Sequence, residues 1–169
     1  VESFLSRMLA EHHHFWNDSR KAKAKKLRLS QEEVTVLASI VEKESFRKSE
    51  QPTIAGLYLN RLRKGMKLQS DPTVIYALGD FSIRRVLKKD LKFDSPYNTY
   101  KYKGLPVGSI SLPSVQAIDA VLNYEKHQFL YMCAKEDFTG YHNFAENAVQ
   151  HYANAARYRK ALNSRNIKR

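Results

Sequence analysis

The sequence predicts an α+β fold, a mainly helical domain with one small antiparallel β-hairpin, and two observations support this prediction. Helix-start signals recur along the chain, most clearly at Ser30 and Asp71. A single hairpin pattern comes late, where the apolar run QFLYMCA is followed by the turn KEDFTG and then by YHNF. With 169 residues, of which 43% are hydrophobic and 27% charged, the chain can bury a core of its own.

The first part of the chain is expected to form an N-terminal helix and a basic connector, residues 1–29, ahead of a main domain over residues 30–169. An amphipathic helix is predicted over residues 1–17, with these apolar residues on one side: Phe4, Leu5, Met8, Leu9 and Phe15 or Trp16. The basic run RKAKAKKLR follows, and it is typical of a solvated helix or connector. Because the chain starts without Met inside a helical pattern, we expect it to be a piece of a longer protein.

Two helices are predicted at the start of the main domain. Ser30 and Glu33 form a Ser-x-x-Glu capping box, and the helix that they begin carries Glu44 in its last turns. The next helix is expected over residues 52–63, with Gly65 as its C-terminal stop.

The second half is expected to alternate irregular and helical segments. In SDPTVIYALGD, Asp71 is the expected N-cap, Pro72 the first helical residue and Gly79 the stop. Residues 80–112 are rich in Pro, Asn, Gly and Tyr and are expected to be turn-rich. Pro113 is expected to open a helix, and a last helix is predicted over residues 145–162 with these residues facing inward: Val149, Tyr152 and Ala156.

The charge of the chain is strongly positive, +12 with a pI near 9.8. This predicts attraction to a polyanion, whether nucleic acid, an anionic lipid surface or an acidic wall polymer. Cys133 is the single cysteine, so an internal disulfide framework is excluded. No apolar run approaches the roughly 20 residues of a membrane span, and no signal peptide is visible.

Glu44 is the main candidate for chemistry. Successive helical residues are about 100° apart, so Glu42 and Glu44 face opposite ways. Glu44 continues the apolar stripe of Ile40 and Val41, whereas Glu42 belongs to the wetter flank. Burial raises the pKa of a carboxyl group, which suits a general acid in glycoside cleavage. The alternative is an ordinary surface salt bridge from Glu44 to Arg61 or Arg63.

A tyrosine cluster is the second candidate. Tyr97, Tyr100 and Tyr102 alternate with polar residues that include Asn98 and Thr99. Aromatic faces beside amide and hydroxyl groups suit a sugar-binding cleft. The same alternation also fits an ordinary half-buried strand.

Other common chemical motifs are absent from the sequence. The consecutive His12, His13 and His14 would point in three directions on a helix, and His142 and His151 have no matching ligand spacing, so no metal site is predicted. There is also no Gly-rich phosphate loop, Cys-x-x-Cys pair or Gly-x-Ser-x-Gly elbow.

Four segments, in this order, resemble the MltG (YceG-like) family of endolytic peptidoglycan transglycosylases. The segments are LASIVEKES, AGLYLNRLRKGMKLQSDPTVIYALG, SPYNTYKYKGLP and YHNF, and the similarity covers about residues 34–160. The resemblance implies a lysozyme-like catalytic domain over residues 30–169, preceded in the full protein by a LysM-like subdomain and a membrane anchor. The chain departs from the family pattern at Tyr141, where a small residue is usual, and at Leu112, where a polar cap is expected.

The resemblance also implies the site residues. Glu44 matches the catalytic glutamate of the family. These residues fall on motif positions and are expected to bind substrate: Gln69, Asp71, Tyr97, Asn98 and Tyr100. It implies no metal or other cofactor. It further implies peptidoglycan strands as substrate, peptidoglycan synthases as partners, no specific nucleic acid, and a location at the extracytoplasmic (periplasmic) face of the bacterial inner membrane through a single-pass anchor outside this fragment.

The implied reaction cleaves the β-1,4 bond between N-acetylmuramic acid and N-acetylglucosamine without water and leaves a 1,6-anhydro end. It needs one acid/base, Glu44, whereas a hydrolase would want a second carboxylate about 5–9 Å away. Two alternatives stay open at this point. One is a lysozyme-like muramidase that uses Glu44 with Asp71, and the other is a non-catalytic basic module that binds the wall or nucleic acid.

Overall fold

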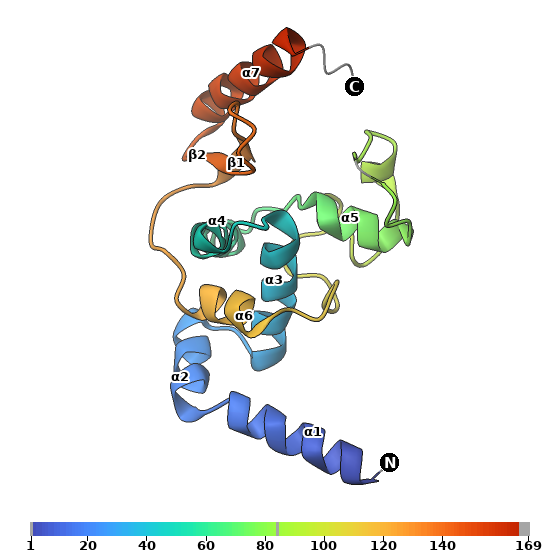
Figure 1. Cartoon of the computed structure of the whole chain (residues 1–169), viewed down its shortest axis with the longest axis vertical. Coiled ribbons are helices and arrows are strands. Elements are labelled where there is room, and N and C mark those ends of the chain that lie inside the picture. Colours follow the sequence, from blue (N-terminus) through green and yellow to red (C-terminus); the bar gives the residue numbers. More distant parts are fainter. Residues whose placement is uncertain (1, 84, 166–169) are drawn as a thin grey trace.

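The computed structural model describes residues 2–83 and 85–165, and it confirms a mainly helical α+β fold with a two-stranded antiparallel sheet (Figure 1). The elements, in chain order, are α1 (Glu2–Phe15), α2 (Asp18–Leu27), α3 (Gln31–Glu44), the 3-10 helix η1 (Lys48–Glu50), α4 (Gln51–Arg63), α5 (Asp71–Leu78), the 3-10 helix η2 (Asp90–Lys92), α6 (Val115–Leu122), β1 (Tyr131–Ala134), β2 (His142–Ala145) and α7 (Ala148–Ser164).

The core forms around α3, which lies in the middle of the molecule between α4, α5 and α6 (Figure 1). The capping box starts this helix as predicted, since Ser30 Oγ accepts from the Glu33 N–H and Glu33 accepts from the Ser30 N–H. The apolar side of α3 is fully buried against the inward residues of α4 and α6. The buried residues of this core include Val34, Leu37, Ile40, Val41, Ile54, Leu57, Tyr58, Ala117 and Val121.

The hairpin and α7 form a layer beside this core. Tyr131 pairs with Ala145, and Ala134 pairs with His142. The predicted hairpin is confirmed, although β1 is shorter than the apolar run suggested. The predicted inward face of α7 is wrong, because Val149, Tyr152 and Ala156 are exposed.

Another face of α7 lies on the strands. Asn154 is buried and donates to the Phe144 carbonyl oxygen at 3.4 Å, and His151 stacks on Tyr131 with ring centroids 5.3 Å apart. A polar and an aromatic contact, together with the buried Leu162, therefore mark the inward face of this helix.

The N-terminal helices differ from each other. α1 is a helix as predicted, but none of its residues is buried. Of its predicted apolar side, Phe4, Leu5, Met8 and Leu9 are exposed, whereas Phe15 is partly buried and Trp16, just after the helix, belongs to the core. The basic run is helical in α2, which packs on the core through Ala24 and through the ion pair of Arg20 with Asp119 at 3.0 Å. The boundary at residues 29 and 30 stays a prediction. Within the described ranges, no helix is long and apolar enough to span a membrane.

Two predicted helix starts are shifted. Ser70, and not Asp71, is the N-cap of α5, so Asp71 is the first helical residue. Ser70 caps through its extended backbone alone, because its hydroxyl group is used elsewhere. Similarly, Ser114 caps α6 by accepting from the Ala117 N–H at 3.3 Å, so this helix starts after Pro113. Gly79 ends α5 as predicted, with φ +70°.

Candidate active site

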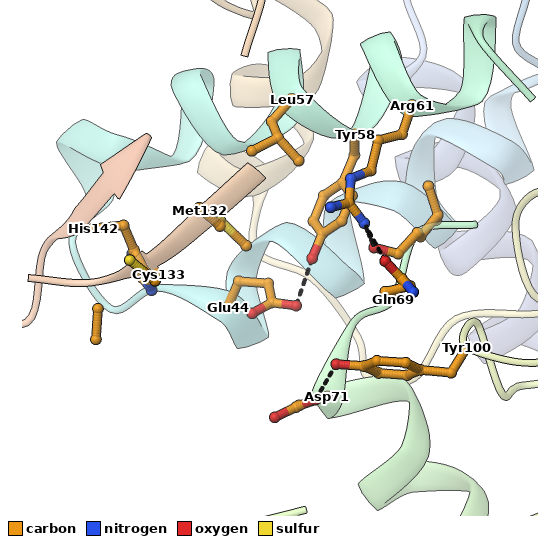
Figure 2. Close-up of a pocket in the computed structure, with 12 residues that line it drawn as sticks. Glu44, Leu57, Tyr58, Arg61, Gln69, Asp71, Tyr100, Met132, Cys133 and His142 are labelled. Carbon is orange, nitrogen blue, oxygen red and sulfur yellow. Dashed lines mark hydrogen bonds between the residues drawn. The ribbon is translucent and has the colours of Figure 1, made fainter. Parts of the chain in front are cut away.

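Glu44 is the last residue of α3, and two hydroxyl groups from other segments hold one of its carboxylate oxygens. Tyr58 of α4 donates to Glu44 Oε1 at 2.6 Å (Figure 2). Ser70 Oγ, at the start of α5, donates to the same oxygen at 2.5 Å. Three helices that are apart in the sequence therefore meet at this carboxyl group.

The surroundings of Glu44 favour its protonated form. Burial raises the pKa of Glu44 above its ordinary value, while the hydrogen bonds from Ser70 and Tyr58 act in the opposite direction. Glu44 Oε2 makes no hydrogen bond within the part of the chain that the structure describes. The second oxygen is thus the one available to carry a proton toward a ligand.

The alternative of a surface ion pair for Glu44 is wrong, because neither arginine pairs with it. Arg63 donates to the Tyr124 hydroxyl at 3.1 Å. Arg61 is only 6% exposed and donates to the carbonyl oxygens of Leu130 at 2.6 Å and Leu68 at 2.7 Å. Arg61 thereby joins α4, the loop before α5 and the start of β1.

A cavity of about 200 Å³ opens in front of Glu44 (Figure 2). Its walls come from α3, α4, the loop that leads into α5, the tyrosine-rich loop and the hairpin. The lining residues are Glu44, Leu57, Tyr58, Arg61, Leu68, Gln69, Asp71, Tyr100, Met132, Cys133, Ala134 and His142. The lining is therefore mixed, with acidic, basic and phenolic side chains among apolar ones.

The structure brings three of the predicted substrate-binding residues to this cavity with Glu44: Gln69, Asp71 and Tyr100. Tyr100 donates to Asp71 Oδ1 at 2.5 Å (Figure 2). Burial is the main cause that raises the pKa of the Tyr100 phenol, and the hydrogen bond to Asp71 adds to it. Gln69 Oε1 accepts from Arg61 at 3.3 Å. Gln69 also has φ +54°, a left-handed backbone that is strained for a residue with a side chain and typical of functional sites.

The other two predicted substrate-binding residues do not line the cavity. Asn98 is fully buried, and its amide group donates to the carbonyl oxygens of Leu91 and Phe93 at 3.1 and 2.7 Å. Its Oδ1 accepts from the Tyr100 N–H at 3.0 Å, so it shapes the loop that presents Tyr100. Tyr97 packs on Tyr76 with ring centroids 4.7 Å apart. A direct contact of either residue with substrate stays a prediction.

Tyr58, Ser70, Arg61 and His142 are site residues that the sequence did not reveal as such. One signal was available for Tyr58, because a tyrosine in the apolar stripe of a helix must find a partner for its hydroxyl group. Ser70 and His142 lie within the segments that resemble the family, but their spacing gave no signal, because only the packing of distant segments brings them to Glu44.

Metal ligands do not gather at this site. Over residues 2–83 and 85–165, no group of three or more His, Cys, Asp or Glu side chains could hold a metal ion. Independence from cofactors stays a prediction.

Comparison with known proteins gives a consistent result. The model of the YceG-like family matches residues 1–157. An endolytic murein transglycosylase of Bacillus subtilis is 42% identical over 120 residues, which are 71% of this chain and 33% of that protein. An endolytic murein transglycosylase of Streptococcus pneumoniae is 34% identical over 166 residues, which are 94% of this chain and 29% of that protein.

A solved structure is also similar. A YceG-like protein of Listeria monocytogenes superposes with a TM-score of 0.72 at 39% identity, over 79% of this chain and 43% of that one. The curated transglycosylases are longer proteins, and the chain spans about a third or less of their length. The family match over nearly its whole length, together with a glutamate held in a cavity, shows that the chain belongs to the YceG-like family.

Proposed function

We propose that this domain is an endolytic murein transglycosylase that cleaves the β-1,4 bond between N-acetylmuramic acid and N-acetylglucosamine in peptidoglycan strands and leaves 1,6-anhydro ends. The observation that carries the proposal is Glu44, a carboxyl group with raised pKa and one free oxygen in a cavity. The names of the relatives support the same reaction class.

Glu44 would act first as acid and then as base. Protonated on Oε2, it gives its proton to the glycosidic oxygen while the bond from that oxygen to C1 of the muramoyl residue breaks. The carboxylate that is left is stabilised on Oε1 by the hydroxyl groups of Tyr58 and Ser70. It then takes the proton of the muramoyl C6 hydroxyl as that oxygen bonds to C1, which restores the acid.

Asp71 is the residue on which a hydrolytic alternative depends. It is the second carboxylate among the residues that line the cavity, and it is not occupied as a helix cap. Its Oδ1 accepts from the Tyr100 hydroxyl, so one of its two oxygens is already bonded, which supports a binding role over activation of water. A muramidase that used Asp71 as base would make a reducing end instead of an anhydro end.

The setting of the enzyme is part of the proposal. We infer that it acts at the extracytoplasmic face of the bacterial membrane, where a longer form of the protein is anchored and meets peptidoglycan synthases. The net charge of +12 supports attraction to an acidic wall, although it would serve a wall-binding module equally well.

Mass analysis of products from purified glycan strands tests the proposal. Anhydro ends are expected from the wild-type chain and not from Glu44→Gln. Reducing ends would establish the muramidase reading, and binding without any product would establish the non-catalytic one.

A further inference from the structure

A second buried carboxylate, Glu50, lies close to the candidate acid and is held by the hairpin. It is 6% exposed, at the end of η1. Glu50 Oε1 accepts from the His142 N–H at 2.7 Å, and Glu50 Oε2 lies 2.8 Å from His142 Nδ1. Ser45, which directly follows Glu44, donates to Oε2 at 3.0 Å. The site described so far gives these groups no role.

The contacts of Glu50 determine the state of the His142 ring. Burial acts to raise the pKa of Glu50, but the hydrogen bonds from His142 and Ser45 outweigh it and hold that pKa below its usual range. Glu50 is therefore a carboxylate, which only accepts hydrogen bonds, so Nδ1 of His142 carries a proton. In the neutral ring, Nε2 is then an acceptor.

The remaining nitrogen of His142 is free for a ligand. His142 lines the same cavity as Glu44, and its side chain is 17% exposed (Figure 2). Its Nε2 makes no hydrogen bond within residues 2–83 and 85–165. An imidazole fixed at one nitrogen and open at the other is the usual arrangement of a histidine that contacts substrate.

The position of the ring is fixed from a second side. Arg47 donates to the Thr139 carbonyl oxygen from Nε at 3.1 Å and from Nη2 at 2.5 Å. Ser49 and Tyr141 place their hydroxyl groups 3.4 Å apart. The turn and the residue just before β2 are thus tied to the segment that follows Glu44, and the ring keeps its place relative to the acid.

We propose that His142 is a substrate-binding residue whose Nε2 forms a hydrogen bond with a sugar hydroxyl group beside the scissile bond, and that Glu50 is its positioning residue. The inference rests on the proposed function, because the ligand that it names is the glycan strand. It adds the hairpin to the substrate-binding surface, whereas the substrate-binding residues predicted from the family resemblance all come from other segments.

Two substitutions separate substrate contact from structural support. His142→Asn keeps a donor at the place of Nδ1, for Glu50, and removes the nitrogen that faces the cavity. His142→Gln loses the contact with Glu50 but carries its amide group to about the place of Nε2. His14→Asn, on an exposed helix outside the cavity, is the matched control.

Turnover of peptide-free glycan strands and thermal melting are measured for each variant. We expect His142→Asn to melt like the wild type and to lose about tenfold or more in kcat/KM, with part of the loss recovered in His142→Gln and none seen in the control. Wild-type kcat/KM in a folded His142→Asn protein would overturn the inference. If this variant does not fold, His142→Ala replaces it, and wild-type kcat/KM in a folded His142→Ala protein would overturn the inference.

The role of Glu50 is tested by asking whether the effect of its substitution depends on His142. Glu50→Gln is expected to lower kcat/KM in the wild-type background and to have little further effect in His142→Asn, because both act through one nitrogen. Equal losses in the two backgrounds would mean that Glu50 acts independently of His142.

Binding separates failure of this inference from failure of the proposed function. In a Glu44→Gln background, which needs no turnover, His142→Asn is expected to weaken the binding of peptide-free glycan strands by about two- to tenfold. Unchanged affinity together with unchanged turnover rejects the role of His142, whatever product forms. A wild-type chain that makes no anhydro ends rejects the proposed reaction, and the affinity difference still decides the role of His142.

Discussion

The same substitution at two glutamates of α3 is expected to give opposite results. Glu44→Gln keeps the shape of the side chain, and its amide oxygen still accepts from Tyr58 and Ser70. Only the titrating proton is lost. Turnover should fall about 10²- to 10⁴-fold, the usual share of a general acid, which is roughly 2.7–5.4 kcal/mol of transition-state stabilisation.

The difference in stability between Glu44→Gln and the wild type should depend on pH in a defined direction. Folding raises the pKa of Glu44 above its ordinary 4.5, so the stability that the protonated form supplies is complete below 4.5 and is lost as pH rises through the folded pKa. Gln cannot ionise. The variant should therefore gain in melting temperature relative to the wild type as pH increases above about 4.5.

Glu42 has a different duty. Its carboxylate accepts from the Ser114 N–H, at 3.2 Å to Oε1 and 3.4 Å to Oε2, at the start of α6. An anion at a helix N-terminus contributes about 0.3–1 kcal/mol. Glu42→Gln should lower the melting temperature by about 1–4 °C in a chain of this size and leave turnover nearly unchanged.

The assay is release of anhydro-ended fragments by both variants, with thermal melts from pH 4 to 8 as the control for folding. An active Glu44→Gln protein beside an inactive, folded Glu42→Gln protein would refute the assignment of the acid. A Glu44→Gln protein that is less stable than the wild type at pH 8 would refute the electrostatic argument.

Three further outcomes are expected. Tyr58→Phe removes one of the two hydrogen bonds that lower the pKa of Glu44, so the alkaline limb of its pH–rate profile should move to higher pH, and an unmoved limb would contradict this. Gly56→Ala places a Cβ 2.3 Å from the Glu125 carbonyl oxygen, so it should lower the free energy of unfolding, measured with urea, by about 1–3 kcal/mol. Gly65→Ala is the control: its Cβ would meet nothing within 4 Å, so it reports only the cost of the left-handed backbone. Treatment with a chelator should leave turnover unchanged, and loss of activity that is restored by a metal ion would show a cofactor.

Local signals explain which parts of the fold could be predicted. The capping box of α3, the stop at Gly79 and the hairpin turn depend on residues within a few positions of one another. The start of α5 was misplaced by one residue because both Ser70 and Asp71 are good N-cap residues, and only the distant carboxylate of Glu44 explains why the Ser70 hydroxyl does not cap. The buried face of α7 was predicted wrongly for a similar reason, since contacts with the distant strands determine which side of the helix faces inward.

The candidate site could be predicted in part. The apolar stripe of α3 indicated Glu44, because a carboxyl group on the core face of a helix can be recognised from the spacing of neighbouring residues alone. Family motifs indicated Gln69, Asp71 and Tyr100, which line the cavity. His142 and its partner Glu50 lie in segments that meet only in the folded chain, so no pattern of spacing could connect them.

Arg61 has a consequence for the order in which the chain folds. Its guanidinium group bonds the nearby residues 67–69 and also Leu130, which enters the hairpin much later in the sequence. The helical core can collapse around α3 before the hairpin has formed, but the Arg61 and Glu50 contacts close only when the hairpin docks. The cavity therefore has its final shape only when the hairpin is docked, and amide exchange at the hairpin is expected to be faster than in α3.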